Sequence, residues 1–422
     1  MKKLQEKICV FVVASSLLFA ACVHRDDLIL PQTSSTATQV DEDTIMLFRK
    51  AAERGEAWAQ ANLGRCYFSG IGVTQDKVEA VKWFRKAAER GEAKGQHFLG
   101  VCYLNGHGVI QDNAEAVKWF RKAAEQGDAL AQTDLGRCYS SGIGVPQDNA
   151  MAAKWYRKAA EQGNAQAQAR LGWFYSNGMG VPQDKVEAVK WFRKAAEQGH
   201  AQAEANLGWF YNNGIGVSQD TAEAVKWFRK AAEQGNAWAQ RNLGSYYFSK
   251  RDIPEYKTEA IKWLRKAAEQ GHAEAQRDIG TSYLAGIGVP QDDVEAVIWF
   301  RKAAEQEDAF AQHILGVSYF FGGTGGLSQD KAEAAKWLRK AAENGLALAQ
   351  MTLAMWYFAG TAVPQDDAEA MKWLRKAAEQ GHCDAVFLFE KLEEAQRETR
   401  TETKRAPNLF ETLSAPSLIM PK

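Results

Sequence analysis

The sequence has no excess of charge of either sign. Lysine and arginine together number 52, and aspartate and glutamate together also number 52, so the formal net charge is zero. A nucleic-acid-binding domain needs a basic surface, and electrostatic binding to anionic lipid needs a cluster of basic residues. The composition therefore argues against nucleic acid as a partner and against a polybasic membrane patch.

The chain also lacks the short motifs that mark common enzyme classes. It contains no G-x-x-x-x-G-K-[ST] phosphate loop, no H-E-x-x-H zinc motif and no G-x-S-x-G nucleophile elbow. Its histidines are not spaced as converging metal ligands. We therefore expect no catalytic residue, no metal site and no cofactor, and we do not expect an enzyme.

Cysteine is scarce, with six in 422 residues, which is too few for a disulfide framework in a chain of this size. Cys9 and Cys22 lie near the amino terminus, where Met1 and two lysines precede an apolar run from Ile8 to Ala21. This run is too short for a membrane-spanning helix, so residues 1–22 are predicted to be a signal peptide.

The end of this leader, Leu18-Phe19-Ala20-Ala21-Cys22, resembles the bacterial lipobox, although leucine is usual where Phe19 stands. The resemblance implies cleavage before Cys22, acylation of this cysteine and, since Val23 follows, passage to the outer membrane. Several acyl chains give stable anchoring. The alternative is an ordinary cleaved leader and a secreted protein. Residues 23–43, which are polar and aperiodic, are predicted to be a flexible linker.

The rest of the chain is dominated by an internal repeat. Nine tryptophans recur at intervals of 36 residues, with a single interval of 38: Trp83, Trp119, Trp155, Trp191, Trp227, Trp263, Trp299, Trp337 and Trp373. A constant period in this range indicates stacked supersecondary units. We number the repeats 1 to 9 from their first residues, Ala57, Ala93, Ala129, Ala165, Ala201, Ala237, Ala273, Ala309 and Ala347.

Each repeat is predicted to contain two helices, at about 57–68 and 77–90 in repeat 1. Asp76 is placed as an N-cap, with Glu79 at the spacing of a capping box. Gly91 follows the second helix as a C′ residue, and glycines in the intervening turn permit left-handed backbone angles. The repeat domain is expected to span residues 44–395, with half-repeats as caps at both ends, and residues 396–422 are expected to be a disordered tail.

The pattern A-x-A-Q-x-x-L-G-x-x-Y-x-x-G-x-G-V-x-x-D-x-x-x-A-x-x-W-x-x-K-A-A-x-x-G resembles the Sel1-like repeat, a relative of the tetratricopeptide repeat. The resemblance covers about residues 45–390. It implies an all-α solenoid, a right-handed superhelix of antiparallel helix pairs, and a role as an adaptor that assembles protein complexes. Some cysteine-rich members carry a β-lactamase label, but their pairs of cysteines are missing here.

Two features of the sequence could indicate a catalytic serine or a disulfide bond in such a family. Ser328 and Lys331 have the S-x-x-K spacing of penicillin-recognising enzymes, but no S-D-N or K-T-G element accompanies them. We expect Ser328 to be a turn residue before a helix cap. Cys66, Cys102 and Cys138 occupy one position of repeats 1 to 3 and could pair in an oxidising compartment. Free, half-buried thiols are the favoured interpretation.

Comparison of the nine repeats separates two sides of the first helix. Residues that stay nearly constant, such as Gln60, Leu63 and Gly64, share one side when projected at about 100° per residue. The second, sixth and ninth residues vary and lie opposite, and we name them the variable stripe. Because packing between near-identical repeats demands constancy, the variable stripe is the candidate protein-binding groove. Its proposed contact residues are Trp58, Arg65, Phe98, Arg137, Arg170, Trp173, Trp209, Trp238 and Phe310.

Three functions are compatible with this organisation. The first is a non-enzymatic scaffold in the bacterial cell envelope that binds a protein or peptide, in envelope assembly or host interaction, with an amino-terminal lipid anchor in the membrane. The second is a β-lactamase-like or penicillin-binding activity. The third is a structural protein that binds peptidoglycan. The absence of catalytic motifs and the variable stripe favour the first.

Overall fold

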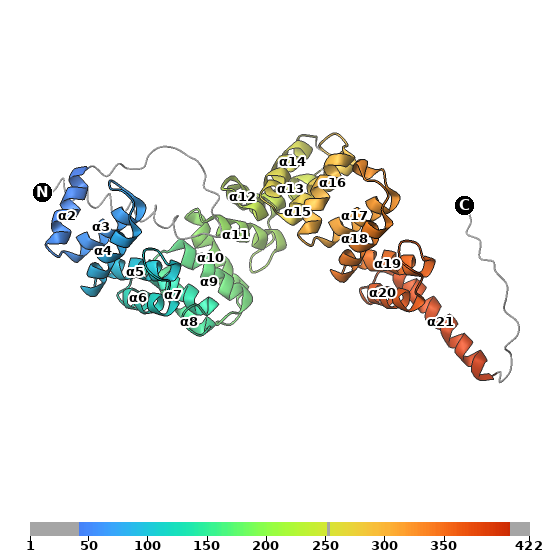
Figure 1. Cartoon of the computed structure of the whole chain (residues 1–422), viewed down its shortest axis with the longest axis horizontal. Helices are drawn as coiled ribbons and strands as arrows, with labels where there is room; N and C mark the ends of the chain where they lie inside the picture. Colours follow the sequence, from blue (N-terminus) through green and yellow to red (C-terminus); the bar gives the residue numbers. More distant parts are fainter. Residues whose placement is uncertain (1–41, 251–253, 406–422) are drawn as a thin grey trace. The chain divides into compact units, whose positions relative to one another are not determined.

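The computed structural model describes residues 42–250 and 254–405 of the chain. Within these ranges it contains twenty α-helices, α2 to α21, one short 3-10 helix and no β-strand (Figure 1). The all-α solenoid of paired helices in series, expected from the repeats, is confirmed. The predicted signal peptide with Cys22, nearly all of the predicted linker and the end of the predicted tail lie outside the described residues.

Each repeat forms one helix pair, preceded by the single helix α2 (Glu42–Glu53). The first helices of the nine pairs are α3 (Ala57–Ser69), α5 (Ala93–Asn105), α7 (Ala129–Ser141), α9 (Ala165–Asn177), α11 (Ala201–Asn213), α13 (Ala237–Ser249), α15 (Ala273–Ala285), α17 (Ala309–Phe321) and α19 (Ala347–Ala359). The second helices are α4 (Lys77–Glu89), α6 (Asn113–Glu125), α8 (Asn149–Glu161), α10 (Lys185–Glu197), α12 (Thr221–Glu233), α14 (Pro254–Glu269), α16 (Asp293–Glu305), α18 (Lys331–Glu343) and α20 (Asp367–Glu379).

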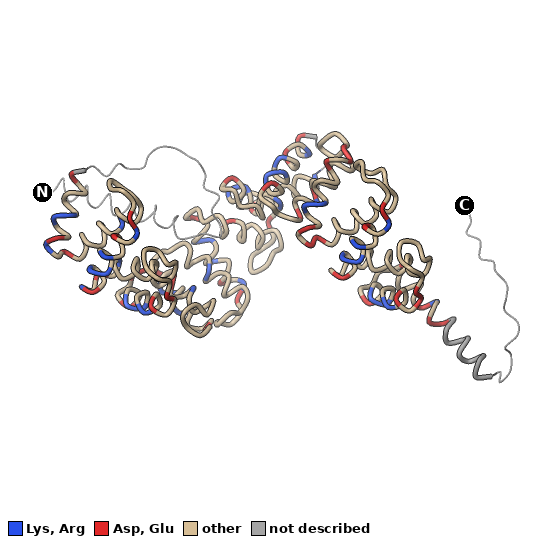
Figure 2. Tube along the Cα trace, viewed as in Figure 1, with Lys and Arg blue, Asp and Glu red and all other residues tan. Residues whose placement is uncertain are grey.

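The helix pairs belong to two compact bodies, divided after Lys230. The first body contains α2 to α11 and most of α12, and the second contains α13 to α21. Lysine and arginine are mixed with aspartate and glutamate in both bodies, mostly on the second helices (Figure 2). No described helix is both long and apolar enough to cross a bilayer.

The second helices begin at the predicted aspartate caps, but only half of the predicted capping box forms. The carboxylate of Asp76 accepts hydrogen bonds from the backbone N–H groups of Val78 and Glu79, both at 2.9 Å. The backbone N–H of Asp76 instead donates to the carbonyl of Tyr67 at 2.8 Å. The side chain of Glu79 therefore pairs with Lys82 Nζ, at 2.8 Å, and does not reach back to the cap.

The turn between the two helices of a repeat packs against the preceding repeat. Gly144, the second turn glycine of repeat 3, has φ = +69°, and a β-carbon there would lie 2.1 Å from the carbonyl oxygen of Asn113. Only glycine combines this φ with such a close backbone approach. The equivalent glycines Gly108, Gly180 and Gly216 make the same approach.

In the core of a repeat, a glycine of the first helix lies against a large apolar side chain of the second helix, which is an aromatic ring in most repeats. Gly64 of α3 is buried, and a β-carbon there would lie 2.7 Å from the ring of Phe84 in α4. Leu63 and Phe84 are themselves fully buried. The second-helix tryptophans are buried or half-buried, and Trp155 shares an apolar cluster with Leu135 of its own repeat and Val101 of the previous repeat. Their predicted packing role is confirmed.

A chain of glutamines connects neighbouring repeats. Gln96 donates from Nε2 to the carbonyl of Ala88, in the second helix of repeat 1, at 3.2 Å. Its Oε1 accepts from Gln126, at the end of the second helix of repeat 2, at 2.7 Å. The pair recurs as Gln162–Gln132, Gln198–Gln168, Gln270–Gln240, Gln306–Gln276 and Gln380–Gln350.

Three departures from the repeat pattern have structural consequences. In repeat 6 the capping aspartate is missing, and α14 begins earlier, at Pro254, in the position where proline loses no helical hydrogen bond. Glu307 replaces a C′ glycine and adopts φ = +68°, a left-handed conformation that is costly for residues with a β-carbon. The longer turn of repeat 8 contains the 3-10 helix Thr324–Gly326.

The carboxyl-terminal boundary differs from the prediction. The last helix, α21, runs from Cys383 to Arg405 and so continues beyond residue 395, where the repeat domain was expected to end. Residues 396–405, predicted to belong to a disordered tail, are therefore helical. The sequence of this segment is rich in Glu, Gln, Lys and Arg, whose helix propensity extends α21 beyond the last repeat.

Candidate protein-binding face

The constant side of each first helix is the packed side. In α3, Ala59, Leu63 and Gly64 are buried, and the Gln60 side chain donates to the carbonyl of Ala52 at 3.1 Å. The same glutamine-to-carbonyl bond recurs at Gln132, Gln168, Gln276 and Gln350. The internal comparison of repeats therefore identified the packed side correctly.

Large apolar side chains are exposed on the variable stripe. Trp58, Trp173 and Phe310 are 37%, 42% and 37% exposed. Leu348 and Met355, which also belong to the variable stripe, are exposed, and Trp209 and Trp238 are half-buried. The indole of Trp173 packs edge-on against Phe174, with ring centroids 5.8 Å apart, so it is held in place while remaining accessible. Exposed large apolar side chains, when they cluster, mark interaction surfaces.

Two residues predicted for the groove are not accessible. Arg65 is 7% exposed and Phe98 only 4% exposed. The ring of Phe98 packs against Phe84, with centroids 5.2 Å apart, and the Arg65 guanidinium lies over the Phe98 ring at 5.4 Å. In repeats 1 and 2 the variable stripe therefore contributes to packing between neighbouring first helices, and these two residues are removed from the candidate face.

The two predicted arginines in repeats 3 and 4 differ in their surroundings. Arg170 is exposed. Arg137 is half-buried, and its guanidinium lies 3.0 Å from the carboxylate of Asp134. Arg170 can therefore contact a partner directly, whereas Arg137 is already engaged in an ion pair.

Asp134 belongs to a buried polar cluster that joins repeats 2 and 3. His97 Nε2 lies 2.9 Å from the second carboxylate oxygen of Asp134, and both residues are less than a tenth exposed. Burial lowers the pKa of His97, but the hydrogen bond and the negative charge of Asp134 outweigh it and raise the pKa above the ordinary value of 6.5. The charged imidazole is thus stabilised by the facing carboxylate.

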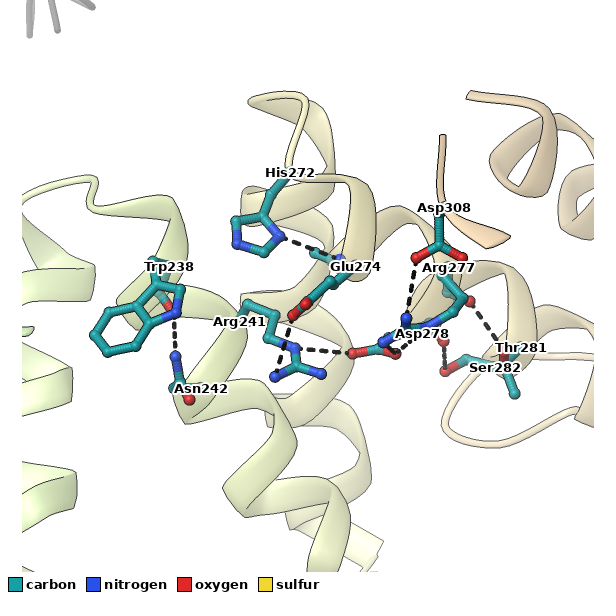
Figure 3. A network of polar contacts seen from close by, with 11 residues as sticks. Trp238, Arg241, Asn242, His272, Glu274, Arg277, Asp278, Thr281, Ser282 and Asp308 are labelled. Atoms are coloured by element: carbon teal, nitrogen blue, oxygen red, sulfur yellow. Dashed lines mark hydrogen bonds and ion pairs between the residues drawn. The ribbon is translucent and has the colours of Figure 1, made fainter. Parts of the chain in front are cut away.

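A second and larger network of the same kind joins repeats 6 and 7 and reaches Asp308, the residue that caps α17 of repeat 8 (Figure 3). Arg241 Nε lies 3.2 Å from one carboxylate oxygen of Asp278, and its Nη1 lies 3.4 Å from Glu274. Arg277 reaches the other oxygen of Asp278 at 3.3 Å and Asp308 at 3.0 Å. Asp278 is thus held between two guanidinium groups.

These networks reveal a position that the sequence comparison missed. His97, Arg241 and Arg277 are the fifth residues of their first helices, and this position also varies among repeats. Asp134 and Asp278 are sixth residues, one repeat further along the chain. In the pairs His97–Asp134 and Arg241–Asp278 the fifth residue of one repeat faces the sixth residue of the next, and this spacing of 37 residues between a histidine or arginine and an aspartate was the available signal.

Histidines that follow the C′ glycines cap first helices. The ring Nδ1 of His200 accepts from the backbone N–H of Ala203 at 3.2 Å, and His272 accepts likewise from Ala275 at 3.4 Å. Burial lowers the pKa of His272, which favours the neutral ring that can accept this bond. Among the described residues, no group of three or more His, Cys, Asp and Glu side chains could hold a metal ion.

The three equivalent cysteines are free thiols, as favoured, but they are fully buried and not half-buried. Cys66, Cys102 and Cys138 are each at most 1% exposed and form no disulfide. Burial raises the pKa of Cys66 to about 11 and the pKa values of Cys102 and Cys138 to about 12. These thiols are therefore unreactive core residues.

Ser328 lies in the turn before α18, as expected. Both Ser328 and Lys331 are exposed, and the neighbouring Asp330 caps α18 by accepting from the backbone N–H groups of Ala332 and Glu333. Within the described ranges, no buried site surrounds this pair.

Two solved structures resemble the chain along much of its length. The first is a protective antigen present in uropathogenic Escherichia coli strains displaying an SLR fold: it is 34% identical, the match covers 89% of this chain and 93% of that chain, and the TM-score is 0.60. The second is a Sel1 repeat protein from Oxalobacter formigenes, 33% identical, with 58% of this chain and 96% of that chain covered and a TM-score of 0.53. A comparison with functionally curated proteins gave no match.

The family model for the Sel1 repeat matches ten segments of the chain. The first match, residues 37–56, is a partial repeat that includes α2, and the others correspond to the nine helix pairs, at 59–92, 93–128, 129–164, 165–200, 201–236, 239–272, 273–308, 309–346 and 347–382. Together these matches cover far more than half of the sequence. The chain therefore belongs to the Sel1 repeat family.

Proposed function

We propose that the chain is a non-enzymatic scaffold of the bacterial cell envelope that binds a protein or peptide along the variable stripe. Sel1 repeat proteins are helical repeat scaffolds, typically for protein interaction. The envelope location rests on the lipobox-like sequence that ends at Cys22. The bound partner can belong to envelope assembly or to contact with a host.

The observation that carries the binding role is the exposure of aromatic side chains on first helices whose other side is fully packed. Trp173 is 42% exposed and Trp58 is 37% exposed, although most large apolar side chains of the described chain are buried. Exposed tryptophans of this kind are the usual anchors of protein interfaces, where a few residues contribute most of the binding free energy. Arg170, which is exposed on α9 three residues before Trp173, adds a charged donor.

A photo-cross-linking amino acid placed at residue 173 of the full chain tests this function in living cells. We expect a discrete cross-linked protein, and we expect much weaker cross-linking when Trp209 is also replaced by alanine. The matched control carries the cross-linker in place of Lys154, an exposed residue of the second helix α8. Equal labelling of the same proteins from residues 154 and 173 would contradict a specific binding face.

Peptidoglycan is the competing ligand, and it is examined in the same series. Purified chain is mixed with isolated peptidoglycan and sedimented. Because the proposed ligand is a protein, we expect the chain to stay in the supernatant. Sedimentation that is abolished by Trp173→Ala would assign the variable stripe to glycan binding instead.

A further inference from the structure

A pocket of about 230 Å³ lies on the first-helix side of the junction between repeats 6 and 7. It is lined by Arg241, Ser245, Phe248, Leu264, Asp278 and Thr281. Phe248 and Leu264 provide apolar surface, whereas Arg241 and Asp278 form the ion pair seen in Figure 3. The pocket therefore combines an apolar lining with a charged one.

The equivalent junction between repeats 1 and 2 explains why this pocket exists. There, large side chains occupy the same place: Phe84 packs against both Phe68 and Phe98, and Arg65 covers the Phe98 ring. At the junction of repeats 6 and 7 the equivalents of Phe84, Phe98 and Arg65 are Leu264, Asp278 and Ser245. Three smaller side chains thus leave space that larger ones fill at the junction of repeats 1 and 2.

The size of the pocket indicates the kind of occupant. Sites for drug-sized ligands and cofactors usually have volumes of about 300–1,000 Å³. At about 230 Å³ the pocket is smaller than this range. It suits one apolar side chain of a partner, in the manner of the anchor residues that enter pockets at protein interfaces.

The charges around the pocket indicate which type of residue lies next to this apolar side chain in the partner. Three carboxylates, Glu274, Asp278 and Asp308, surround two guanidinium groups, so the network has an excess of one negative charge. The Glu274 side chain is 51% exposed, and its contact with Arg241 is the longest of the network, at 3.4 Å. An exposed pair of this kind is weak, so Glu274 can instead pair with a cation on a partner.

We propose that this pocket is the specificity site of the scaffold, and that it receives an apolar side chain from a peptide segment whose adjacent residue is lysine or arginine. The apolar side chain contacts Phe248 and Leu264, and the neighbouring cation contacts Glu274. The assignment rests on the protein-binding function proposed above. It adds the chemistry that a partner must carry.

A random peptide library displayed on phage, selected on the full chain, tests the proposal. We expect the enriched peptides to share Leu, Ile, Met or Phe next to Lys or Arg. A labelled enriched peptide is then titrated against variants. Leu264→Phe restores the ring found in most repeats and fills the pocket, and we expect it to weaken binding about 10-fold or more. Glu274→Gln is expected to weaken binding about 3-fold and to reduce its salt dependence.

Leu338→Phe is the matched control, because Leu338 is the equivalent residue of repeat 8 and does not line the pocket. Unchanged melting temperatures show that the variants are folded. Peptides without the apolar–basic pair, or equal affinity for wild type and Leu264→Phe, overturn the proposal. If the peptides bind the Leu264→Phe variant normally but bind the Trp173→Ala variant more weakly, the scaffold function is supported and the pocket assignment is refuted. If no peptide is enriched and residue 173 gives no cross-link, both fall.

Discussion

Glu307 occupies a position whose backbone conformation is unfavourable for any residue with a β-carbon. The C′ position of a second helix adopts a left-handed conformation, and Glu307 has φ = +68°. A left-handed conformation costs a residue with a β-carbon about 1–2 kcal/mol. Since glycine occupies the equivalent position of most repeats, we predict that Glu307→Gly raises the free energy of unfolding by about 1 kcal/mol, measured by urea denaturation.

Glu307→Ala is the control for this prediction. It removes the carboxylate but keeps the β-carbon, so the backbone cost remains and stability should change little. Equal stabilisation by the alanine and glycine variants would mean that charge, and not backbone conformation, is responsible.

The buried pair of His97 and Asp134 makes stability dependent on pH. The pKa of His97 is raised above 6.5 in the folded chain, so the pair contributes fully below pH 6.5 and its contribution falls as the pH rises through the folded pKa. We predict that Asp134→Asn destabilises the chain most at acidic pH, by about 1–3 kcal/mol, with a smaller loss at about pH 8.

The control is Asp278→Asn, at the equivalent position of repeat 7, where the facing cation is Arg241. Arginine does not titrate in this range, so the loss of stability should depend on pH between about 5 and 8 less than it does in Asp134→Asn; the histidine near Asp278 is His272, whose pKa is lowered mainly by burial. The measurement is the urea midpoint of each variant at several pH values. A loss that varies with pH to the same extent in both variants would refute the role of His97.

At the residue scale, prediction from the sequence was only partly successful. Trp58, Trp173 and Phe310 are exposed as expected, but Arg65 and Phe98 are buried because they pack on each other across a junction. Variation among repeats shows that a position is free of one common packing requirement. It does not show that the position faces solvent, because a variable residue can be matched by a variable partner 37 residues away, as His97 is by Asp134.

At the scale of the helix and the turn, the sequence was a better guide. Helix boundaries in repeat 1 agree with the prediction to within one residue, because Asp76 and the glycines mark them directly. The glycine turn was expected only to need unusual backbone angles. The close approach of Gly144 to Asn113 could not be predicted, since it depends on how one repeat lies against the previous one.

This contact predicts different costs for two glycine substitutions. Gly127 and Gly144 both have positive φ, but a β-carbon at residue 127 has no atom within 4 Å, whereas one at residue 144 would lie 2.1 Å from a carbonyl oxygen. We predict that Gly127→Ala lowers the free energy of unfolding by about 1 kcal/mol, the conformational cost alone. Gly144→Ala should cost at least about 2 kcal/mol more, because the clash forces the turn away from the preceding repeat.

Urea denaturation of the two alanine variants measures this difference. Hydrogen exchange shows where the structure is disturbed. Amide protection should fall at the amino-terminal end of α6, around Asn113, in Gly144→Ala but not in Gly127→Ala. Similar losses in both variants would show that the turn yields without cost and that the close approach is unimportant for stability.

At the scale of the whole molecule, the proposed envelope location depends on Cys22. We predict that the full chain, expressed in a bacterium, incorporates a fatty-acid analogue, and that Cys22→Ser abolishes this labelling because the acylated thiol is removed. Cys9→Ser is the matched control: Cys9 belongs to the segment predicted to be cleaved, so its replacement should leave labelling intact. Labelling retained in Cys22→Ser would place the acyl group elsewhere and refute the anchor.

The glutamine bonds between repeats also bear on how such a chain changes in length. Gln132 donates to Ala124 of the preceding repeat and Gln168 donates to Ala160, so both sides of repeat 3 carry the same chemical connectors. Unequal crossing-over between the coding sequences of two repeats adds or removes a whole 36-residue block, and the new junction regains the same side-chain-to-carbonyl bond. Polar connectors that are identical at successive junctions thus let gene recombination lengthen or shorten the protein without leaving a buried amide unpaired.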